Sequence, residues 1–85
     1  MQTVEIFTKA YCPFCTRAKM LLTHKGVSFQ EIDIQKQPKL RATMLERANG
    51  SSTVPQIFIG DHHVGGCDDL FALESSQKLD GLLGK

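Results

Sequence analysis

The 85-residue sequence lacks tryptophan and contains only one tyrosine, three prolines and three cysteines. It has no apolar run near the roughly 18 residues that a transmembrane helix needs, so a membrane-spanning protein is not expected. Neither sign of charge predominates, because ten Lys and Arg against nine Asp and Glu leave a formal net charge of +1. Such a chain has no general attraction to nucleic acid or to an anionic membrane surface. Its length suits one compact domain, so we expect a single domain over residues 1–85.

The first residues contain no basic segment followed by an apolar stretch, so no secretory signal is visible and we expect a cytoplasmic protein. The cysteines are odd in number, whereas a secreted disulfide scaffold more often has an even set at wider spacing. Cys12 and Cys15 lie three residues apart, and Cys67 is distant. In a chain without an export signal, this pattern favours redox or metal chemistry over a structural disulfide.

Apolar periodicity and turn residues predict an α/β protein with the element order β-α-β-α-β-β-α. The strand–helix–strand start implies a right-handed crossover and a parallel strand pair, and a later hairpin adds an antiparallel pair. We therefore expect a four-stranded mixed sheet flanked by three helices. Strands are predicted over residues 3–8, 27–34, 56–59 and 62–65, and helices over residues 13–25, 38–48 and 66–73.

Two of these strands have particular patterns. Residues 3–8 carry apolar side chains on both sides of the pleat, which is typical of a strand at the centre of a sheet. The period-two alternation of residues 27–34 slips at Gln30 and Glu31, which indicates a bulge or a frayed end there.

Cys12-Pro13-Phe14-Cys15 stands at the predicted junction between the first strand and the first helix. Proline is favoured at the first position of a helix, and residues three apart share one helix face, so the two sulfurs can approach bonding range. Unpaired N–H groups and the positive end of the helix dipole predict a Cys12 pKa below the value of about 8.5 for a free thiol. Lys9 and Arg17 add positive charge nearby. Cys15, inside the helix, suits the role of the resolving thiol.

Two other interpretations of these cysteines remain. A single cysteine is often a small buried hydrophobe, which explains Cys15 alone but not the pair around a proline. Structural zinc usually needs four ligands, and the chain offers three cysteines with His24, His62 and His63 but no second closely spaced cysteine pair. Zinc is therefore disfavoured, and we assign no chemical role to the histidines.

Two further motifs follow, Thr53-Val54-Pro55 and Gly65-Gly66-Cys67-Asp68-Asp69. With these added, the chain resembles the glutaredoxin family of the thioredoxin-like fold, and in particular its small bacterial dithiol members. The order and spacing of the three motifs carry the resemblance, which spans nearly the whole chain. Phe14 stands where the family commonly has tyrosine, so the aromatic face is kept and the hydroxyl is lost.

The resemblance implies a glutathione-dependent oxidoreductase that reduces protein disulfides and glutathione mixed disulfides. Cys12 attacks the disulfide, and either Cys15 or a second glutathione completes the exchange. Glutathione is the cosubstrate, and neither a bound cofactor nor a metal is expected. The implied glutathione-binding residues are Lys9, Phe14, Thr53, Val54, Pro55, Gly66, Cys67 and Asp68.

The family also implies a role for each end of this site. A cis Pro55 turns the N–H and C=O of Val54 toward the peptide of the bound thiol. The backbone of Cys67 and Asp68 receives the α-carboxylate of glutathione, the Asp68 side chain pairs with its ammonium, and Lys9 pairs with its glycine carboxylate.

Simpler interpretations of the same residues stay open. Pro55 is also compatible with the start of an edge strand, Lys9 with a solvated surface position, and Cys67 with a small packed residue. Asp68 and Asp69 are both suited to capping a helix, which we prefer for Asp69. In the second helix, the expected register places Ala42 rather than Arg41 at a position that is often polar in the family. Gln56 either contributes to the site or faces water.

Two alternative functions compete. One is a thioredoxin-reductase-coupled electron donor to ribonucleotide reductase, which Lys9 and the Gly-Gly-Cys-Asp loop disfavour. The other is a glutathione-assisted [2Fe–2S] carrier using Cys12 from two chains, a type that more often has Ser or Gly in place of Pro13 or Cys15. We expect a monomer whose partners are glutathione and disulfide-containing or glutathionylated proteins, with ribonucleotide reductase among the candidate clients.

Overall fold

The computed structural model describes residues 2–85. Among these residues no helix is both long and apolar enough to cross a membrane. In chain order the elements are β1 (Val4–Thr8), α1 (Pro13–His24), β2 (Gln30–Asp33), α2 (Lys39–Arg47), β3 (Gln56–Ile59), β4 (His62–Gly65), α3 (Cys67–Ser75) and α4 (Leu79–Leu83).

The four strands form one mixed sheet in the order β2-β1-β3-β4. β1 runs parallel to β2 and antiparallel to β3, and β3 continues antiparallel into β4. The central place of β1 explains its apolar sequence, because Val4, Ile6 and Phe7 are all at most 2% exposed. The predicted mixed four-stranded sheet is thereby confirmed.

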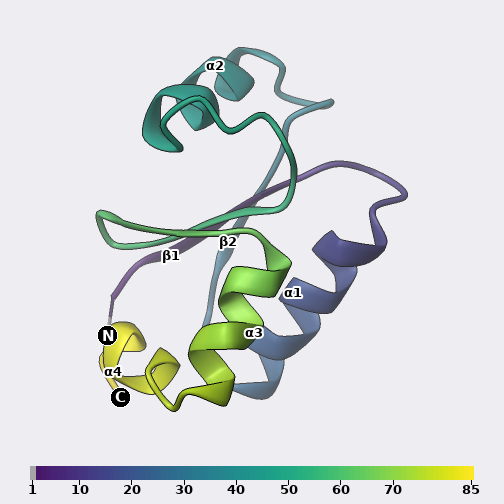
Figure 1. Cartoon of the computed structure of the whole chain (residues 1–85). Coiled ribbons are helices and arrows are strands. Elements are labelled where there is room, and N and C mark those ends of the chain that lie inside the picture. Colours follow the sequence, from purple (N-terminus) through teal and green to yellow (C-terminus); the bar gives the residue numbers. More distant parts are fainter. Residues whose placement is uncertain (1) are drawn as a thin grey trace.

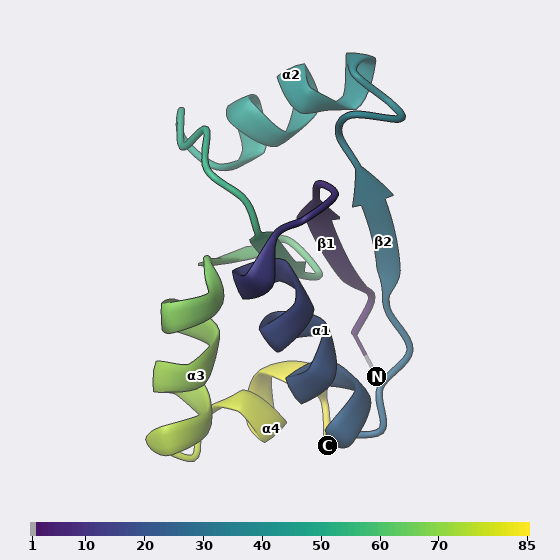
Figure 2. The ribbon, with the colours of Figure 1, turned by 90° about the vertical axis from the view of Figure 1, so that its right-hand side faces the viewer.

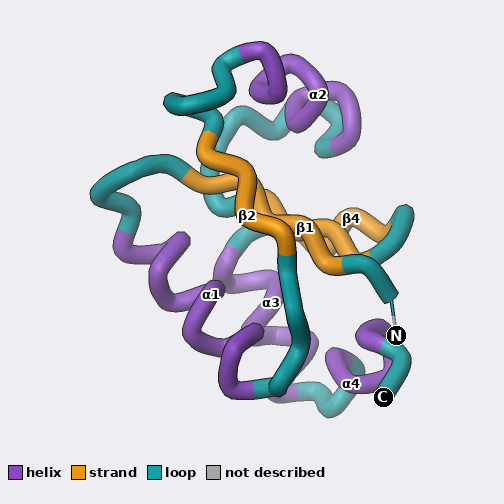
Figure 3. The backbone as a smooth tube through the Cα atoms, turned by 180° about the vertical axis from the view of Figure 1, so that it is seen from behind, coloured by secondary structure: helices purple, strands orange, loops and turns teal. Residues whose placement is uncertain are grey.

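Helices cover both faces of the sheet (Figures 1 and 3), with α2 on one face and α1, α3 and α4 on the other. Side chains that alternate along β3 separate the two cores, as expected of a pleated strand. Ile57 and Ile59 belong to the larger cluster with Ala18 and Leu70 from α1 and α3. Phe58 points the other way, into the smaller cluster below α2.

The helices α1 and α3 run side by side, and their N-terminal ends lie at the same end of the molecule (Figure 2). Because both helices begin there, two sets of unpaired backbone N–H groups meet at one edge of the fold. The end of β1 also reaches this edge.

The second strand is shorter than expected, since β2 begins at Gln30 rather than at residue 27. Its register with β1 is continuous from the pair Glu5–Gln30 to the pair Thr8–Asp33. The slip in the alternation at Gln30 and Glu31 therefore marks the start of the strand and not a bulge. Val27 is still buried, because it packs into the larger core without ladder hydrogen bonds.

The C-terminal helix α4 is absent from the sequence prediction, so four helices rather than three flank the sheet. Five residues with Gly81 among them have little helical tendency of their own, and tertiary contacts stabilise the helix instead. Leu79 and Leu83 are fully buried, and the Lys25 ammonium lies 2.9 Å from a carboxylate oxygen of Asp80.

Candidate active site

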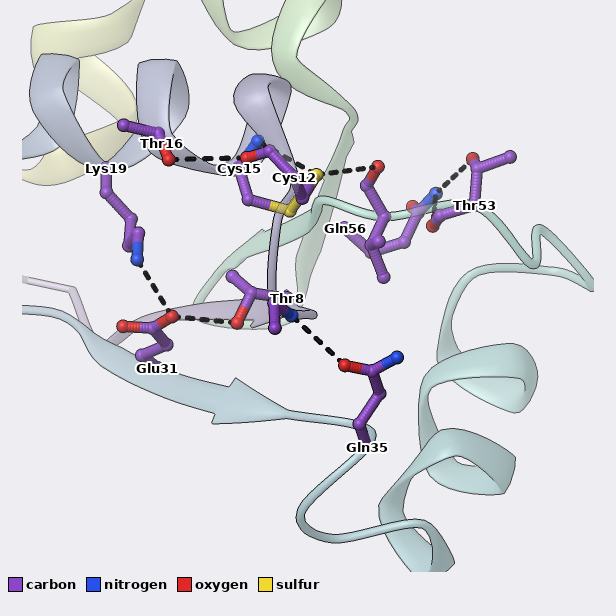
Figure 4. Close-up of a disulfide and its surroundings, with 11 residues drawn as sticks. Thr8, Cys12, Cys15, Thr16, Lys19, Glu31, Gln35, Thr53 and Gln56 are labelled. Atoms are coloured by element: carbon purple, nitrogen blue, oxygen red, sulfur yellow. Dashed lines mark hydrogen bonds and ion pairs between the residues drawn. A yellow bond between two sulfur atoms is a disulfide. The ribbon is translucent and has the colours of Figure 1, made fainter.

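The first two cysteines lie where β1 leads into α1. Cys12 is the N-cap residue of α1 and Pro13 its first helical residue, as predicted. Cys12 and Cys15 form a disulfide with their Cα atoms 5.2 Å apart (Figure 4). Cys12 is 8% exposed and Cys15 is 2% exposed. Cys12 is thus the more accessible sulfur.

The surroundings of the Cys12 sulfur favour negative charge. The Cys15 N–H donates to Cys12 Sγ at 3.2 Å, and the first turn of α1 contains no acidic residue. In the reduced protein this N–H and the helix dipole stabilise a thiolate. Lys9 lines a surface pocket with both cysteines. Arg17, expected to contribute charge here, instead lies over the Phe71 ring at 5.4 Å from its centroid.

The loop before β3 faces the disulfide. The Val54–Pro55 peptide bond is cis, as the resemblance implied. Val54 is half-buried, and its carbonyl oxygen lies 3.8 Å from Cys12 Sγ. The loop therefore places backbone polar groups beside the accessible sulfur.

A pocket of about 540 Å³ lies near the disulfide: Phe14 and Val54, which are neighbours of the two cysteines, line it, and the cysteines themselves do not. Segments far apart in the sequence meet in it: the start of α1, the loop before β3 and the start of α3. All the residues that the resemblance assigned to glutathione, apart from Lys9, line this pocket: Phe14, Thr53, Val54, Pro55, Gly66, Cys67 and Asp68.

Lys9 lines an adjoining pocket of about 480 Å³ together with Arg41. Thr53 and Val54 line both pockets, so the two form neighbouring parts of one surface. Both cations are exposed. In α2, Arg41 lines this pocket and Ala42 does not.

At the start of α3, the two aspartates have different surroundings. The Gly66 N–H donates to Asp69 Oδ2 at 2.9 Å, so Asp69 caps the helix as expected. Asp68 is exposed and lines the pocket. The N–H groups of Cys67 and Asp68 belong to the first turn, where no intrahelical carbonyl is available to them. Cys67 is buried and free, and burial raises the pKa of its thiol.

A sequence model of the glutaredoxin family matches residues 4–64, which is more than half of the chain. The chain belongs to the glutaredoxin family. It is 60% identical over 83 residues to the glutaredoxin of Pseudomonas aeruginosa, covering 98% of each chain. It is 55% identical to Glutaredoxin 3 of Escherichia coli, covering 98% of this chain and 99% of that one.

Solved glutaredoxin structures match the fold. The solution structure of a glutaredoxin from Brucella melitensis has a TM-score of 0.83 at 57% identity, covering 100% of this chain and 94% of that one. The crystal structure of a buckwheat glutaredoxin–glutathione complex has a TM-score of 0.87 at 32% identity, covering 98% and 77%. The thioredoxin-like fold is confirmed, and membership makes this glutaredoxin a thiol–disulfide oxidoreductase.

Two residues of this glutaredoxin have positions that the sequence did not predict. Gln56 is only 3% exposed, so the alternative that it faces water is wrong. Its side chain contacts Thr53 and His63, and both Gln56 and His63 line the larger pocket. Only the strand register of the predicted hairpin could have indicated that Gln56 and His63 lie next to each other.

A polar cluster lies on the other side of the disulfide (Figure 4). The buried Thr8 hydroxyl donates to Glu31 Oε2 at 2.8 Å, and Lys19 Nζ lies 3.0 Å from the same oxygen. Partial burial disfavours the charged form of Glu31. The hydrogen bonds from Lys19 and Thr8 outweigh it and lower the pKa of Glu31 below its ordinary value. In residues 2–85 of this glutaredoxin, no group of three or more His, Cys, Asp or Glu side chains could hold a metal ion.

Proposed function

We propose that the protein is a glutathione-dependent oxidoreductase that reduces protein disulfides and glutathione mixed disulfides. The observation that supports this most strongly is the position of the pocket. Val54, whose carbonyl oxygen lies 3.8 Å from Cys12 Sγ, lines both this pocket and the adjoining one. The adjoining pocket offers the cations Lys9 and Arg41, and the larger pocket offers the N-terminus of α3. A tripeptide with a carboxylate at each end and a thiol between them complements this arrangement.

In this proposal, the γ-glutamyl end of glutathione lies at α3. The N–H groups of Cys67 and Asp68 donate to its α-carboxylate, and the exposed Asp68 carboxylate pairs with its ammonium. The N–H and C=O of Val54 pair with the peptide of its cysteine. Lys9 and Arg41 pair with the glycine carboxylate, and Phe14, which is 53% exposed, covers the sulfur from the α1 side. The buckwheat relative was solved in complex with glutathione, which supports glutathione as the ligand.

The exchange proceeds through a mixed disulfide. The Cys12 thiolate attacks the glutathionyl sulfur of a glutathionylated protein, and the protein thiolate leaves. A second glutathione thiolate then attacks the sulfur of the bound glutathione, which forms glutathione disulfide and restores the Cys12 thiolate. With a protein disulfide, Cys15 attacks Cys12 in the mixed disulfide and releases the client, and two glutathiones then reduce the Cys12–Cys15 bond. The cycle requires a glutathione-containing reducing compartment, and we propose the cytoplasm.

Serine variants of the two cysteines test this division of roles. Cys12→Ser is expected to abolish both reactions, because the more accessible sulfur is lost and the remaining Cys15 is only 2% exposed. Cys15→Ser is expected to keep deglutathionylation and to lose reduction of protein disulfides. The assays are glutathione-coupled turnover of a glutathionylated peptide and of a protein disulfide. An active Cys12→Ser protein would refute the assignment.

A second set of variants tests the pocket. Lys9→Gln and Asp68→Asn each remove one charge at opposite ends, so each is expected to raise the KM for a glutathionylated peptide. Lys78→Gln is the matched control, because Lys78 is an exposed lysine beside α4, outside both pockets. Reduction by thioredoxin reductase with no turnover by glutathione would instead favour a thioredoxin-reductase-coupled donor.

A further inference from the structure

A chain of three polar residues runs from β4 to the loop that faces the disulfide. His63 Nε2 lies 2.6 Å from Gln56 Oε1, and Gln56 Nε2 donates to the Thr53 carbonyl oxygen at 2.9 Å. Gln56 Nε2 also lies 3.3 Å from Thr53 Oγ1. Because Gln56 is only 3% exposed, losing one of these partners leaves a buried amide group without a hydrogen bond.

The direction of these hydrogen bonds is fixed by their chemistry. The Thr53 carbonyl oxygen only accepts hydrogen bonds, so the Gln56 amide nitrogen must face it and the Gln56 oxygen must face His63. That oxygen also only accepts, so His63 Nε2 must carry a hydrogen. The Gln56 amide therefore links the two residues, because its oxygen accepts from His63 and its nitrogen donates to Thr53.

The His63 end of this hydrogen-bonded series packs against the core. The His63 ring stacks on Phe58, with centroids 4.9 Å apart and planes at 24°. Phe58 is 1% exposed and packs edge-on against Phe7. The β3–β4 register pairs Phe58 directly with His63, so the two side chains lie on the same face of the sheet.

The Thr53 end of this hydrogen-bonded series lies close to the reactive sulfur. Thr53 precedes Val54, whose carbonyl oxygen lies 3.8 Å from Cys12 Sγ. Thr53, Val54, Gln56 and His63 all line the larger pocket. We propose that His63 is a positioning residue, which acts through Gln56 to hold the Thr53–Val54 backbone where it pairs with the peptide of bound glutathione. This inference rests on the proposed glutathione dependence and assigns it a further residue.

Substitutions of His63 test the contribution of its N–H group separately from that of its ring. His63→Phe keeps an aromatic ring against Phe58 and removes the donor. We expect it to raise the KM for a glutathionylated peptide about fivefold, the order of one hydrogen bond's net contribution. His63→Gln restores an N–H donor and is expected to recover part of this loss. His62→Phe is the matched control, because the neighbouring His62 is exposed and lies outside the pocket.

Two further readouts distinguish positioning from general stability. Dithiothreitol reduces the Cys12–Cys15 disulfide without using the pocket, so its rate is expected to stay unchanged in His63→Phe. Because His63 acts through Gln56, the double variant His63→Phe/Gln56→Met is expected to be no worse than Gln56→Met alone. Nitrogen NMR of the wild-type protein is expected to show a hydrogen on His63 Nε2.

Each unfavourable result has its own meaning. A wild-type protein that turns over glutathionylated peptide, with an unchanged KM in His63→Phe, would overturn this inference and leave the proposed function intact. Additive effects of the two substitutions, or an Nε2 without hydrogen, would also overturn it. A wild-type protein without glutathione-dependent turnover would overturn the proposed function and the inference together.

Discussion

Replacing Gly65 by alanine tests how the glycine pair before α3 supports both the helix and the pocket. Gly65 has a φ of 112°, in a region that side chains disfavour. An added Cβ would lie only 2.9 Å from Asp69 Cγ and closer still to the carboxylate oxygen, so the Asp69 side chain must turn away. Asp69 then loses the hydrogen bond that its carboxylate accepts from the Gly66 N–H at 2.9 Å in the wild-type protein.

The expected cost has two parts. The strained backbone contributes about 1–3 kcal/mol, and the lost cap about 1 kcal/mol, so Gly65→Ala is expected to lower the free energy of unfolding by about 2–4 kcal/mol. Urea unfolding measures this change. Glutathione affinity should fall as well, because the N–H groups of Cys67 and Asp68 shift with the start of α3.

A double variant and a control make the reasoning refutable. Asp69→Ala alone is expected to cost about 1 kcal/mol, but to add almost nothing to Gly65→Ala, because the cap is already lost there. Gly81→Ala is the control: its φ is not positive and an added Cβ meets nothing within 4 Å. It should stabilise α4 by about 0.5–1 kcal/mol. A Gly65→Ala protein as stable as the wild type, or additive effects with Asp69→Ala, would contradict this account.

Three other predictions concern an ion pair at α4, the free cysteine and an arginine that stacks on a core aromatic ring. The hydrogen bond from Lys25 lowers the pKa of Asp80 below 3.8, so this pair stabilises the fold above that pH and its contribution is lost as the pH falls through the lowered value. Urea midpoints should therefore show Asp80→Asn as less stable than the wild type at neutral pH, with a deficit that narrows in acid; a constant deficit would count against this. Burial raises the pKa of Cys67, so mass spectrometry should find its alkylation at neutral pH far slower in the native than in the urea-unfolded protein, and equal rates would disprove the burial argument. The Arg47 guanidinium lies 4.1 Å from the centroid of Phe58, so Arg47→Lys should cost about 1 kcal/mol in equilibrium unfolding, and no change would show that this stacking contributes little.

Local signals in the sequence were enough to predict most of the framework. Pro13 and Gly26 mark the start and the end of α1 through backbone preferences that do not depend on the rest of the fold. The apolar residues of β1 placed it correctly at the centre of the sheet. Three short motifs converge on one pocket because the sheet brings the ends of their elements to the same edge.

The errors arise where tertiary contacts decide. α4 exists because Leu79 and Leu83 fill the core, and no local signal around Gly81 indicates it. Residues 41 and 42 are consecutive in α2, and consecutive side chains point about 100° apart around a helix, so the sequence alone did not show that Arg41 lines the pocket with Lys9.

The burial of Gln56 likewise depends on a partner. A glutamine beside a turn commonly faces water. This one is buried because His63 from the next strand lies beside it and supplies a hydrogen bond. Only the register of the hairpin establishes that pairing, and the sequence does not fix which of the two neighbouring histidines faces Gln56.

The central claim is that the start of α1 holds the Cys12 sulfur as a thiolate. The most direct measurement is the ultraviolet absorbance of the thiolate as a function of pH in the reduced Cys15→Ser protein, which keeps the backbone N–H that reaches Cys12 Sγ. Half-ionisation should occur at a pH well below about 8.5, the pKa of a free cysteine thiol. A Cys12 that titrates like free cysteine would contradict the account.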